Sequence, residues 1–290
     1  MPSKFQTTGA ALGAAAVVAS GAGIAAAAPI APAPSTNTAP IAAVLADAGT
    51  TLATYRFANN SVTSPRPITG LTGDTAIVGI DFRVQDGKLY GVGNASGLYT
   101  IGLNGAARKV KTLTVALSGT SFGVDFNPAA NALRVVSDTG QNLRQPFSPN
   151  VRAATINDGS LNYTAGVTAS GITSAAYTNN DLSTDSGTTL FVVDSTLDQL
   201  AIQAPANNGS LSVTGKLGLD AGPAVGFDIF STLDANGRAN GATGYLVLPA
   251  DFGANLYTVD LLGGQATLQQ ALPLAAVDIA VVPVGTTPAA

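Results

Sequence analysis

Four residue types that carry much of protein chemistry are missing from this chain of 290 residues: cysteine, histidine, tryptophan and glutamate. Without Cys or His, the chain has no thiolate or imidazole metal ligand, no Cys nucleophile and no Ser–His relay. All 17 acidic residues are therefore Asp, and the side chains left for acid–base chemistry are Asp, Lys and Tyr. These absences exclude cysteine and serine–histidine hydrolases and metal sites built on imidazole or thiolate groups.

Charge is also scarce, because only 10% of the residues are charged and the formal net charge is −4. There is no long basic run to follow a phosphate backbone, so nucleic acid is not expected as a partner. The missing Glu and the scarce Lys remove good helix formers, whereas Thr, Val, Gly and Asn are abundant. The composition predicts an all-β protein.

The N-terminal residues 1–27 are typical of a signal peptide. Lys4 precedes an apolar run at 10–18, and Ala25-Ala26-Ala27 matches an A-x-A cleavage site. An uncleaved membrane anchor is the alternative, but the run is rich in Ala and Gly and is interrupted by Ser20, which favours cleavage. Residues 28–40 then form a Pro/Ala-rich linker. We therefore expect a secreted or extracytoplasmic protein, monomeric and without a transmembrane segment in its mature chain.

A tetrad of the form Gly-x-Asp-apolar recurs along the chain. It reads GIDF at 79–82, GVDF at 123–126, GFDI at 226–229 and, in degenerate form, AVDI at 276–279. The first two copies are 44 residues apart and the last two 50, whereas 103 residues separate the middle pair. SAAY at 174–177 fills that gap, with Ala176 in place of the Asp. A period near 50 residues predicts a propeller or a solenoid.

Each tetrad except the last is followed by further short apolar runs between Gly, Asn and Asp turns. After GVDF, for example, come ALRVVS at 132–137 and NLRQPF at 142–147, and a more variable fourth run closes each unit. Four such strands make one propeller blade. The last tetrad lacks these runs, but the stretches at 42–47, 50–57 and 61–71 match the missing three. The sequence therefore predicts a five-bladed β-propeller over residues 41–284, in which N-terminal strands complete the blade begun by the C-terminal strand, followed by a disordered tail at 285–290.

The segment FGVDFNPAANALRVVSDTGQNLR at 122–144, together with the LYGVG…LYTI pattern, resembles a family of exported bacterial proteins. That family is catalogued as domain of unknown function 4394. The resemblance covers most of residues 41–284 and implies a propeller-like fold and an extracytoplasmic location. It implies no activity.

The repeated acidic residues are the first candidate site. One Asp from each of four innermost strands would face the central channel: Asp81, Asp125, Asp228 and Asp278. Oxygen ligands converging there would suit Ca²⁺ or, less well, Mg²⁺. The alternative, which we favour, is that each carboxylate accepts backbone N–H groups of the neighbouring blade and fixes the blade spacing. Crowding of backbones near the axis explains the Gly two residues earlier.

Two arginines in the second blade are the second candidate site. Alignment of the blades places Arg134 where others have Tyr90, Phe191 and Leu246, and Arg144 where others have Tyr99 and Tyr257. Like charges on adjacent strands are unfavourable unless an anion lies between them. That anion is either Asp125 or Asp138, or a carboxylate, phosphate or sulfate ligand held by two guanidinium groups. Asn142 and Gln141, in the turn between the two strands, would add amide contacts.

Three functions agree with these features. The favoured one is an exported, non-catalytic binding or scaffold module for a glycan, a peptide or an envelope component. The alternative is a hydrolase or lactonase-like enzyme that uses channel Asp residues and a divalent cation, although arabinanase-like propellers use a carboxylate trio that normally includes Glu. The third is a structural protein of the cell surface or matrix. An enzyme would require at least two channel Asp side chains free of backbone partners.

Overall fold

The structure is a computed structural model that describes residues 39–148, 150–183 and 185–288. The predicted signal peptide (1–27) and residues 28–38 of the predicted linker lie outside these ranges. Of the predicted tail, residues 289–290 also lie outside them, whereas residues 285–288 are placed and Thr286 donates its N–H to Pro283 O at 3.2 Å. In the described part of the chain, no helix has the length and apolar character needed to cross a membrane.

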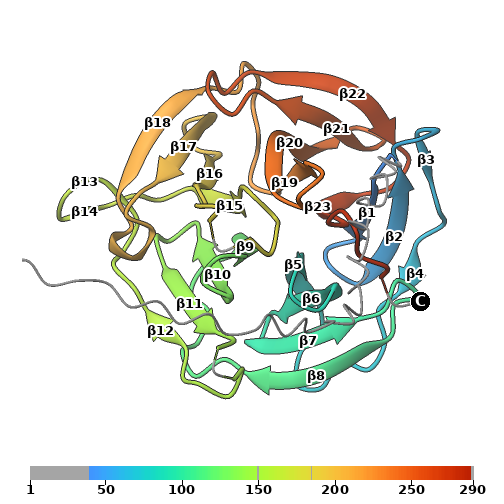
Figure 1. Cartoon of the computed structure of the whole chain (residues 1–290), viewed down its shortest axis with the longest axis horizontal. Coiled ribbons are helices and arrows are strands. Elements are labelled where there is room, and N and C mark those ends of the chain that lie inside the picture. The colour runs from blue at the N-terminus through green and yellow to red at the C-terminus, as the bar shows by residue number, and fades with distance from the viewer. Residues whose placement is uncertain (1–38, 149, 184, 289–290) are drawn as a thin grey trace, which may run out of the picture. The chain divides into compact units, whose positions relative to one another are not determined.

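Five antiparallel sheets are arranged around a central axis, which confirms the predicted five-bladed β-propeller (Figure 1). The strands of blades 1 and 2 are β5 (Ile77–Arg83), β6 (Lys88–Gly93), β7 (Gly97–Ile101) and β8 (Ala107–Thr112), then β9 (Phe122–Asn127), β10 (Ala132–Ser137), β11 (Asn142–Pro146) and β12 (Ile156–Asn157). Those of blades 3 and 4 are β15 (Ile172–Tyr177), β16 (Leu190–Asp194), β17 (Gln199–Gln203) and β18 (Leu211–Lys216), then β19 (Gly226–Leu233), β20 (Ala239–Ala250), β21 (Gly253–Val259) and β22 (Ala266–Leu272).

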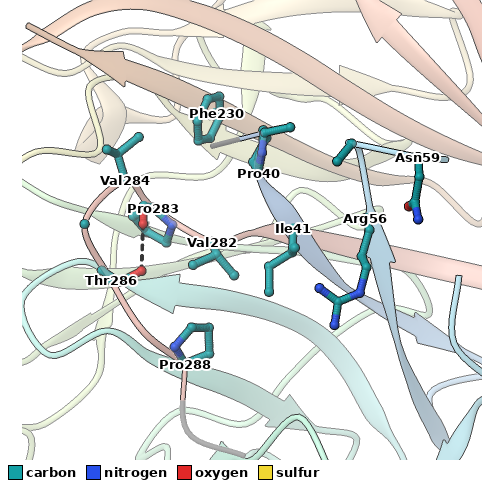
Figure 2. A pocket seen from close by; sticks show the side chains of 13 residues that line it. Pro40, Ile41, Arg56, Asn59, Phe230, Val282, Pro283, Val284, Thr286 and Pro288 are labelled. Carbon is teal, nitrogen blue, oxygen red and sulfur yellow. Dashed lines mark hydrogen bonds between the residues drawn. The ribbon is translucent and has the colours of Figure 1, made fainter. Parts of the chain in front are cut away.

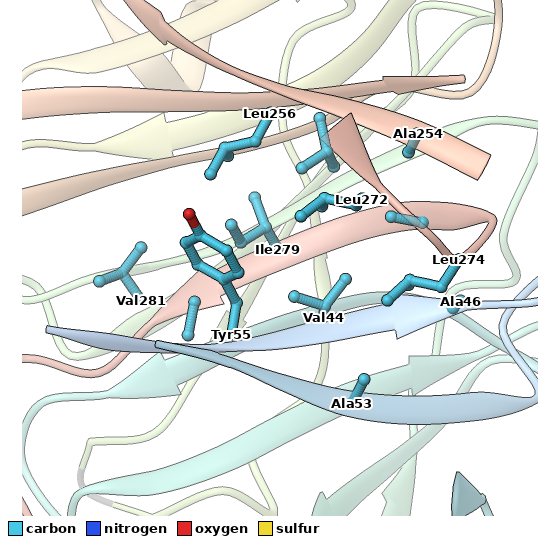
Figure 3. Close-up of a cluster of buried hydrophobic side chains, with 13 residues drawn as sticks. Val44, Ala46, Ala53, Tyr55, Ala254, Leu256, Leu272, Leu274, Ile279 and Val281 are labelled. Atoms are coloured by element: carbon cyan, nitrogen blue, oxygen red, sulfur yellow. The ribbon is translucent and has the colours of Figure 1, made fainter. Parts of the chain in front are cut away.

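Blade 5 takes strands from both ends of the described chain. Its strands are β23 (Ala276–Val281), β1 (Ile41–Ala46), β2 (Thr51–Arg56) and β3 (Ser61–Val62), with β4 (Arg66–Pro67) also pairing with β2. β1 is antiparallel to β23, with Val44 opposite Ile279. Figure 3 shows Val44, Tyr55 and Ile279 packed in one apolar cluster with Leu256 and Leu272 of blade 4. The ring is therefore closed by N-terminal strands, as the sequence predicts, because β1 pairs with the inner strand β23 and continues its blade outwards.

Two small elements complete the described structure. The hairpin of β13 (Asn162–Thr164) and β14 (Val167–Thr168) lies between blades 2 and 3 in the chain, and Tyr163 holds it to Asp194 through a hydrogen bond of 2.8 Å. A 3₁₀-helix, η1 (Ala206–Asn208), connects β17 to β18. This helix places Asn207 beside blade 2, where its side chain contacts Arg134.

The innermost strands are β5, β9, β15, β19 and β23, and they approach one another closely (Figure 1). β15 contains SAAY, the degenerate copy of the tetrad, and Ala176 is fully buried there. A Cβ atom on Gly123 would lie only 2.5 Å from the backbone N of Ala175 in the next blade, and one on Gly226 only 2.4 Å from Asp278 Cα. At these two positions glycine is required by contact between neighbouring backbones, whereas the two degenerate copies have Ser174 and Ala276 there.

Candidate functional site

Each of the four repeated Asp residues joins its own blade to the next one around the ring. Their side-chain Oδ atoms accept backbone N–H groups of the following inner strand: Asp278 from Ile80 (2.8 Å), Asp81 from Phe126 (2.7 Å), Asp125 from Tyr177 (3.0 Å) and Asp228 from Val281 (2.5 Å). The bonds all run in the same direction around the axis. Blade 3 has Ala176 at this position, so its junction with blade 4 is made differently, by Asn180 Nδ2 donating to Ile229 O at 2.9 Å.

Three of these carboxyl groups accept a second backbone N–H on their other oxygen, from the residue that follows each Asp: Phe82, Ile229 and Ile279. Seven of the eight carboxyl oxygens thus accept a backbone N–H. The remaining oxygen belongs to Asp125, whose other oxygen is bonded to Tyr177. This geometry agrees with the interpretation that the Asp set fixes blade spacing, and it provides no pair of Asp side chains free of backbone partners.

Burial makes this set electrostatically unfavourable when it is fully charged. One oxygen each of Asp81, Asp125 and Asp228 lies within 4.8 Å of the others, and all three residues are buried. Burial, with repulsion from the neighbouring carboxylates, raises the pKa of Asp81 and of Asp125 well above its usual value. Burial also raises the pKa of Asp228 to about 6, although the N–H groups of Val281 and Ile229 oppose the shift.

Such a group of oxygens is compatible with a hard cation such as Ca²⁺. Asp278 belongs to the same set, and we call the four residues Asp81, Asp125, Asp228 and Asp278 the aspartate ring. Burial raises the pKa of Asp278 well above its usual value, although the N–H groups of Ile80 and Ile279 oppose the shift. Protonation of these carboxyl groups is therefore a second way to neutralise the aspartate ring. Because the backbone bonds already explain the position of every carboxyl group, the geometry by itself requires no cation.

The two arginines of blade 2 lie directly opposite each other on β10 and β11 and share one carboxylate. Arg134 Nη1 donates to Asp158 Oδ2 at 2.7 Å, and Arg144 donates to both Asp158 oxygens, through Nε at 3.0 Å and Nη2 at 3.1 Å. The prediction that Asp125 or Asp138 lies between them is therefore corrected. Asp125 accepts the N–H of Tyr177, and the Asp138 carboxylate accepts N–H and O–H groups of the β8–β9 connection.

Further contacts fix the Arg134 guanidinium, which is 2% exposed. Nη1 also donates to Asn142 Oδ1 at 2.8 Å, Nη2 donates to Asn207 Oδ1 at 2.7 Å, and Nε lies 3.4 Å from the Tyr177 hydroxyl. Asn142 thus contacts Arg134, and its amide N–H groups donate to Gly159 O and Ala206 O, whereas the predicted contact of this amide with a ligand stays a prediction. Gln141 does not contact Arg134: its amide donates to Ala116 O and accepts from the N–H of Ser118. Gln141 therefore anchors the β8–β9 connection and does not belong to the arginine site.

A cavity of about 320 Å³ opens between blades 2 and 3 beside the arginines. We call it the arginine cavity, and it is lined by Asn127, Ala130, Ala132, Arg134, Arg144, Tyr177, Thr188, Pro205, Ala206 and Asn207. Among the described residues, Arg134 and Arg144 are the only charged ones that line it, and the Arg144 side chain is 28% exposed. Two guanidinium groups against one carboxylate leave one positive charge without a partner in this group of three.

Sequence reasoning missed Asp158 and Asn207. Asp158 carried no signal in the sequence, because only the pairing of Arg144 with Ile156 across β11 and β12 makes it the diagonal neighbour of Arg144 on the same face. Asn207 carried none either, because it lies 73 residues from Arg134 and reaches it only through the packing of blade 3 against blade 2.

Two larger hollows lie near the C-terminal segment. One, of about 480 Å³, is shown in Figure 2 between β1, β2 and residues 282–288, and Arg56 is the one charged side chain that the described part of the chain contributes to its lining. The other, of about 690 Å³, lies among the loops at 180–185 and 233–238 and residues 284–286, and Asp185 pairs with Arg238 there at 2.6 Å. Both partners are exposed, with side chains 66% and 53% accessible, so this pair contributes little to stability.

Comparison with protein families finds a match to the domain of unknown function DUF4394 over residues 51–280. The chain belongs to this family. The match runs from β2 to β23, so it includes the aspartate ring and the arginine cavity and, of the ring-closing blade, all strands except β1. Comparison with proteins of curated function finds no match.

Solved structures also resemble this family member at low sequence identity. A protein of unknown function from Bacteroides caccae is 10% identical, with a TM-score of 0.43, and the alignment covers 84% of this chain and 98% of that one. A protein from Lactobacillus plantarum is 13% identical, with a TM-score of 0.39 and coverage of 83% and 98%. A protein of unknown function from Bacteroides thetaiotaomicron is 16% identical, with a TM-score of 0.43, and 83% of this chain aligns with 60% of that one.

Proposed function

We propose that this protein is an exported, non-catalytic binding module that holds a small anionic ligand in the arginine cavity. The observation that carries the proposal is the sharing of one carboxylate, Asp158, by two arginines that both line a cavity. Guanidinium groups pair well with carboxylate and phosphate groups, and Arg144 is partly exposed to the cavity. The ligand is an acidic group on a glycan, a peptide or another envelope component.

The aspartate ring supports a binding function over a catalytic one. A general acid or base must reach the proton that it transfers. The channel carboxyl groups are buried, and seven of their eight oxygens accept backbone N–H groups. They hold the blades at fixed spacing, so the arginine cavity lies on a preorganised scaffold.

Thermal unfolding of the purified protein with a panel of small anions tests this function. A ligand that binds only the folded state stabilises it by about 2.7 kcal/mol at a hundredfold excess over its dissociation constant. For a domain of this size, each kcal/mol raises the midpoint by roughly 2–4 °C. We expect at least one of acetate, glucuronate, phosphate and sulfate to produce such a rise, relative to chloride at equal ionic strength.

Two variants with the same change of charge show where the anion binds. Arg144→Gln removes the partly exposed guanidinium of the cavity, whereas Arg66→Gln removes an exposed one on β4. We expect the anion effect to disappear in the first variant and to persist in the second. The proposal fails if no anion stabilises the protein, or if both variants respond as the unchanged protein does.

A further inference from the structure

We infer that the arginine cavity selects a singly charged, hydroxylated carboxylate of the sugar-acid type and discriminates against doubly charged phosphate and sulfate. The inference rests on the proposed function and names the ligand class of the same site. Three features carry it: the balance of charge in the cavity, the edge of Arg144 that remains for a ligand, and the neutral lining.

The two arginines and Asp158 together carry one net positive charge. Arg134 and Arg144 carry two positive charges, and Asp158 returns one negative charge behind them. Asp125 is the cross-strand neighbour of Arg134, but its carboxyl group accepts the N–H of Tyr177, and burial raises its pKa well above the usual value, which favours the neutral form. One monovalent anion therefore neutralises the group. A divalent anion would leave a net negative charge partly withdrawn from water, which is costly.

The geometry of Arg144 agrees with a carboxylate. Its Nε and Nη2 atoms bind Asp158 side-on, one to each oxygen. Among the described residues, none accepts a hydrogen bond from Arg144 Nη1. The end formed by Nη1 and the second N–H of Nη2 is therefore available for a second planar acceptor. A carboxylate matches two parallel N–H groups of this kind in a bidentate pair.

The rest of the lining is neutral and mixed in character. Asn127, Thr188 and Asn207 bring polar side chains, and alanines, Pro205 and the Tyr177 ring bring apolar surface. The oxygen of Asn207 accepts from Arg134, which leaves its amide N–H groups for a ligand. A volume of about 320 Å³ is at the small end of ligand pockets, which suits one sugar ring with its hydroxyl groups.

Isothermal titration calorimetry at pH 8 and constant ionic strength tests the selectivity. The probes are glucuronate, glucose as the matched ring without a carboxylate, phosphate and sulfate. At this pH phosphate is mainly doubly charged. We expect glucuronate to bind at least tenfold more tightly than phosphate, sulfate or glucose. The inference is overturned if phosphate or sulfate binds as tightly as glucuronate, although the proposed function then stands, or if glucose binds as tightly. If no anion binds, the proposed function itself fails.

The variant Asp158→Asn tests the charge argument directly. It adds one net positive charge to the cavity, so we expect the ratio of sulfate affinity to glucuronate affinity to rise at least tenfold. An unchanged ratio in folded protein would refute the argument from charge.

Because Asp158 accepts three hydrogen bonds, this variant can fail to fold. Arg144→Gln is then the second variant. It leaves Arg134 and Asp158 as a neutral pair, so we expect the affinity for glucuronate to fall at least tenfold. An unchanged affinity overturns the inference.

Discussion

The aspartate ring predicts an unusual response to pH and to one conservative substitution, Asp125→Asn. Within the ring, oxygens of Asp81, Asp125 and Asp228 lie within 4.8 Å of one another. Two unit charges at that separation repel by about 3.5 kcal/mol at an effective dielectric constant of about 20. The folded protein avoids part of this repulsion by keeping protons on the ring, which is why burial and neighbouring carboxylates raise these pKa values.

The sign of the pH dependence follows from Asp228. Its pKa is about 6 in the folded protein, against an ordinary value of 3.8. Between these values the folded state binds more protons than the unfolded state. The contribution of Asp228 to stability is therefore fully present below about pH 3.8 and is lost as the pH rises through 6. A difference of about two pH units corresponds to roughly 3 kcal/mol from this residue alone. Asp81, Asp125 and Asp278 contribute with the same sign.

Asp125→Asn separates repulsion from hydrogen bonding. The Asn oxygen can still accept the N–H of Tyr177, and the variant removes one carboxyl group from the ring. We expect a gain of at least about 1 kcal/mol at pH 7.5, or roughly 2–4 °C in the unfolding midpoint, and a smaller loss of stability between pH 5 and pH 8. Urea denaturation and thermal scans at several pH values measure both quantities.

Asp81→Asn is the matched control. Both Asp81 oxygens accept backbone N–H groups, from Phe82 and Phe126, and an amide has only one oxygen to replace them. The lost bond costs about 1–3 kcal/mol, so this variant should be less stable than Asp125→Asn at pH 7.5. The reasoning is refuted if Asp125→Asn lowers the midpoint and leaves the pH dependence unchanged. It is also refuted if Ca²⁺ raises the midpoint and Asp125→Asn abolishes that rise, because a cation would then neutralise the ring.

Two further substitutions test the packing of the second blade. Gly123→Ala should destabilise the protein by about 1–3 kcal/mol in urea denaturation, because its Cβ would clash with the backbone of Ala175, whereas Gly187→Ala, with open space around it, should change stability by less than about 0.5 kcal/mol. Phe126→Ala should cost about 3–5 kcal/mol by the same measurement, because the ring is 1% exposed and packs edge-on against Phe147 at 4.9 Å; a loss below 1 kcal/mol would contradict this packing.

The sequence alone was sufficient to predict the five blades and the way in which N-terminal strands close the ring. Strand runs and turn residues act locally, so the repeat could be aligned with itself, and SAAY at 174–177 could be assigned to an inner strand although it lacks the Asp. The stretch at 42–47 matched a second strand of a blade, and β1 does pair with β23. The same alignment showed that Arg134 and Arg144 depart from the repeat and face the same side, because parity within paired strands depends only on register.

Only the tertiary structure decided what these side chains contact. Asp125 bonds to Tyr177 and Arg134 to Asn207 across a blade junction, and the rotation of one blade against the next sets both contacts. Sequence spacing contains no information on that rotation. The acidic partner of the arginines was uncertain for the same reason, since several Asp residues lie near them in the chain and only the path of the edge strand β12 selects Asp158. The repeat thus determines the scaffold, whereas the packing between blades determines the charge and shape of the cavity.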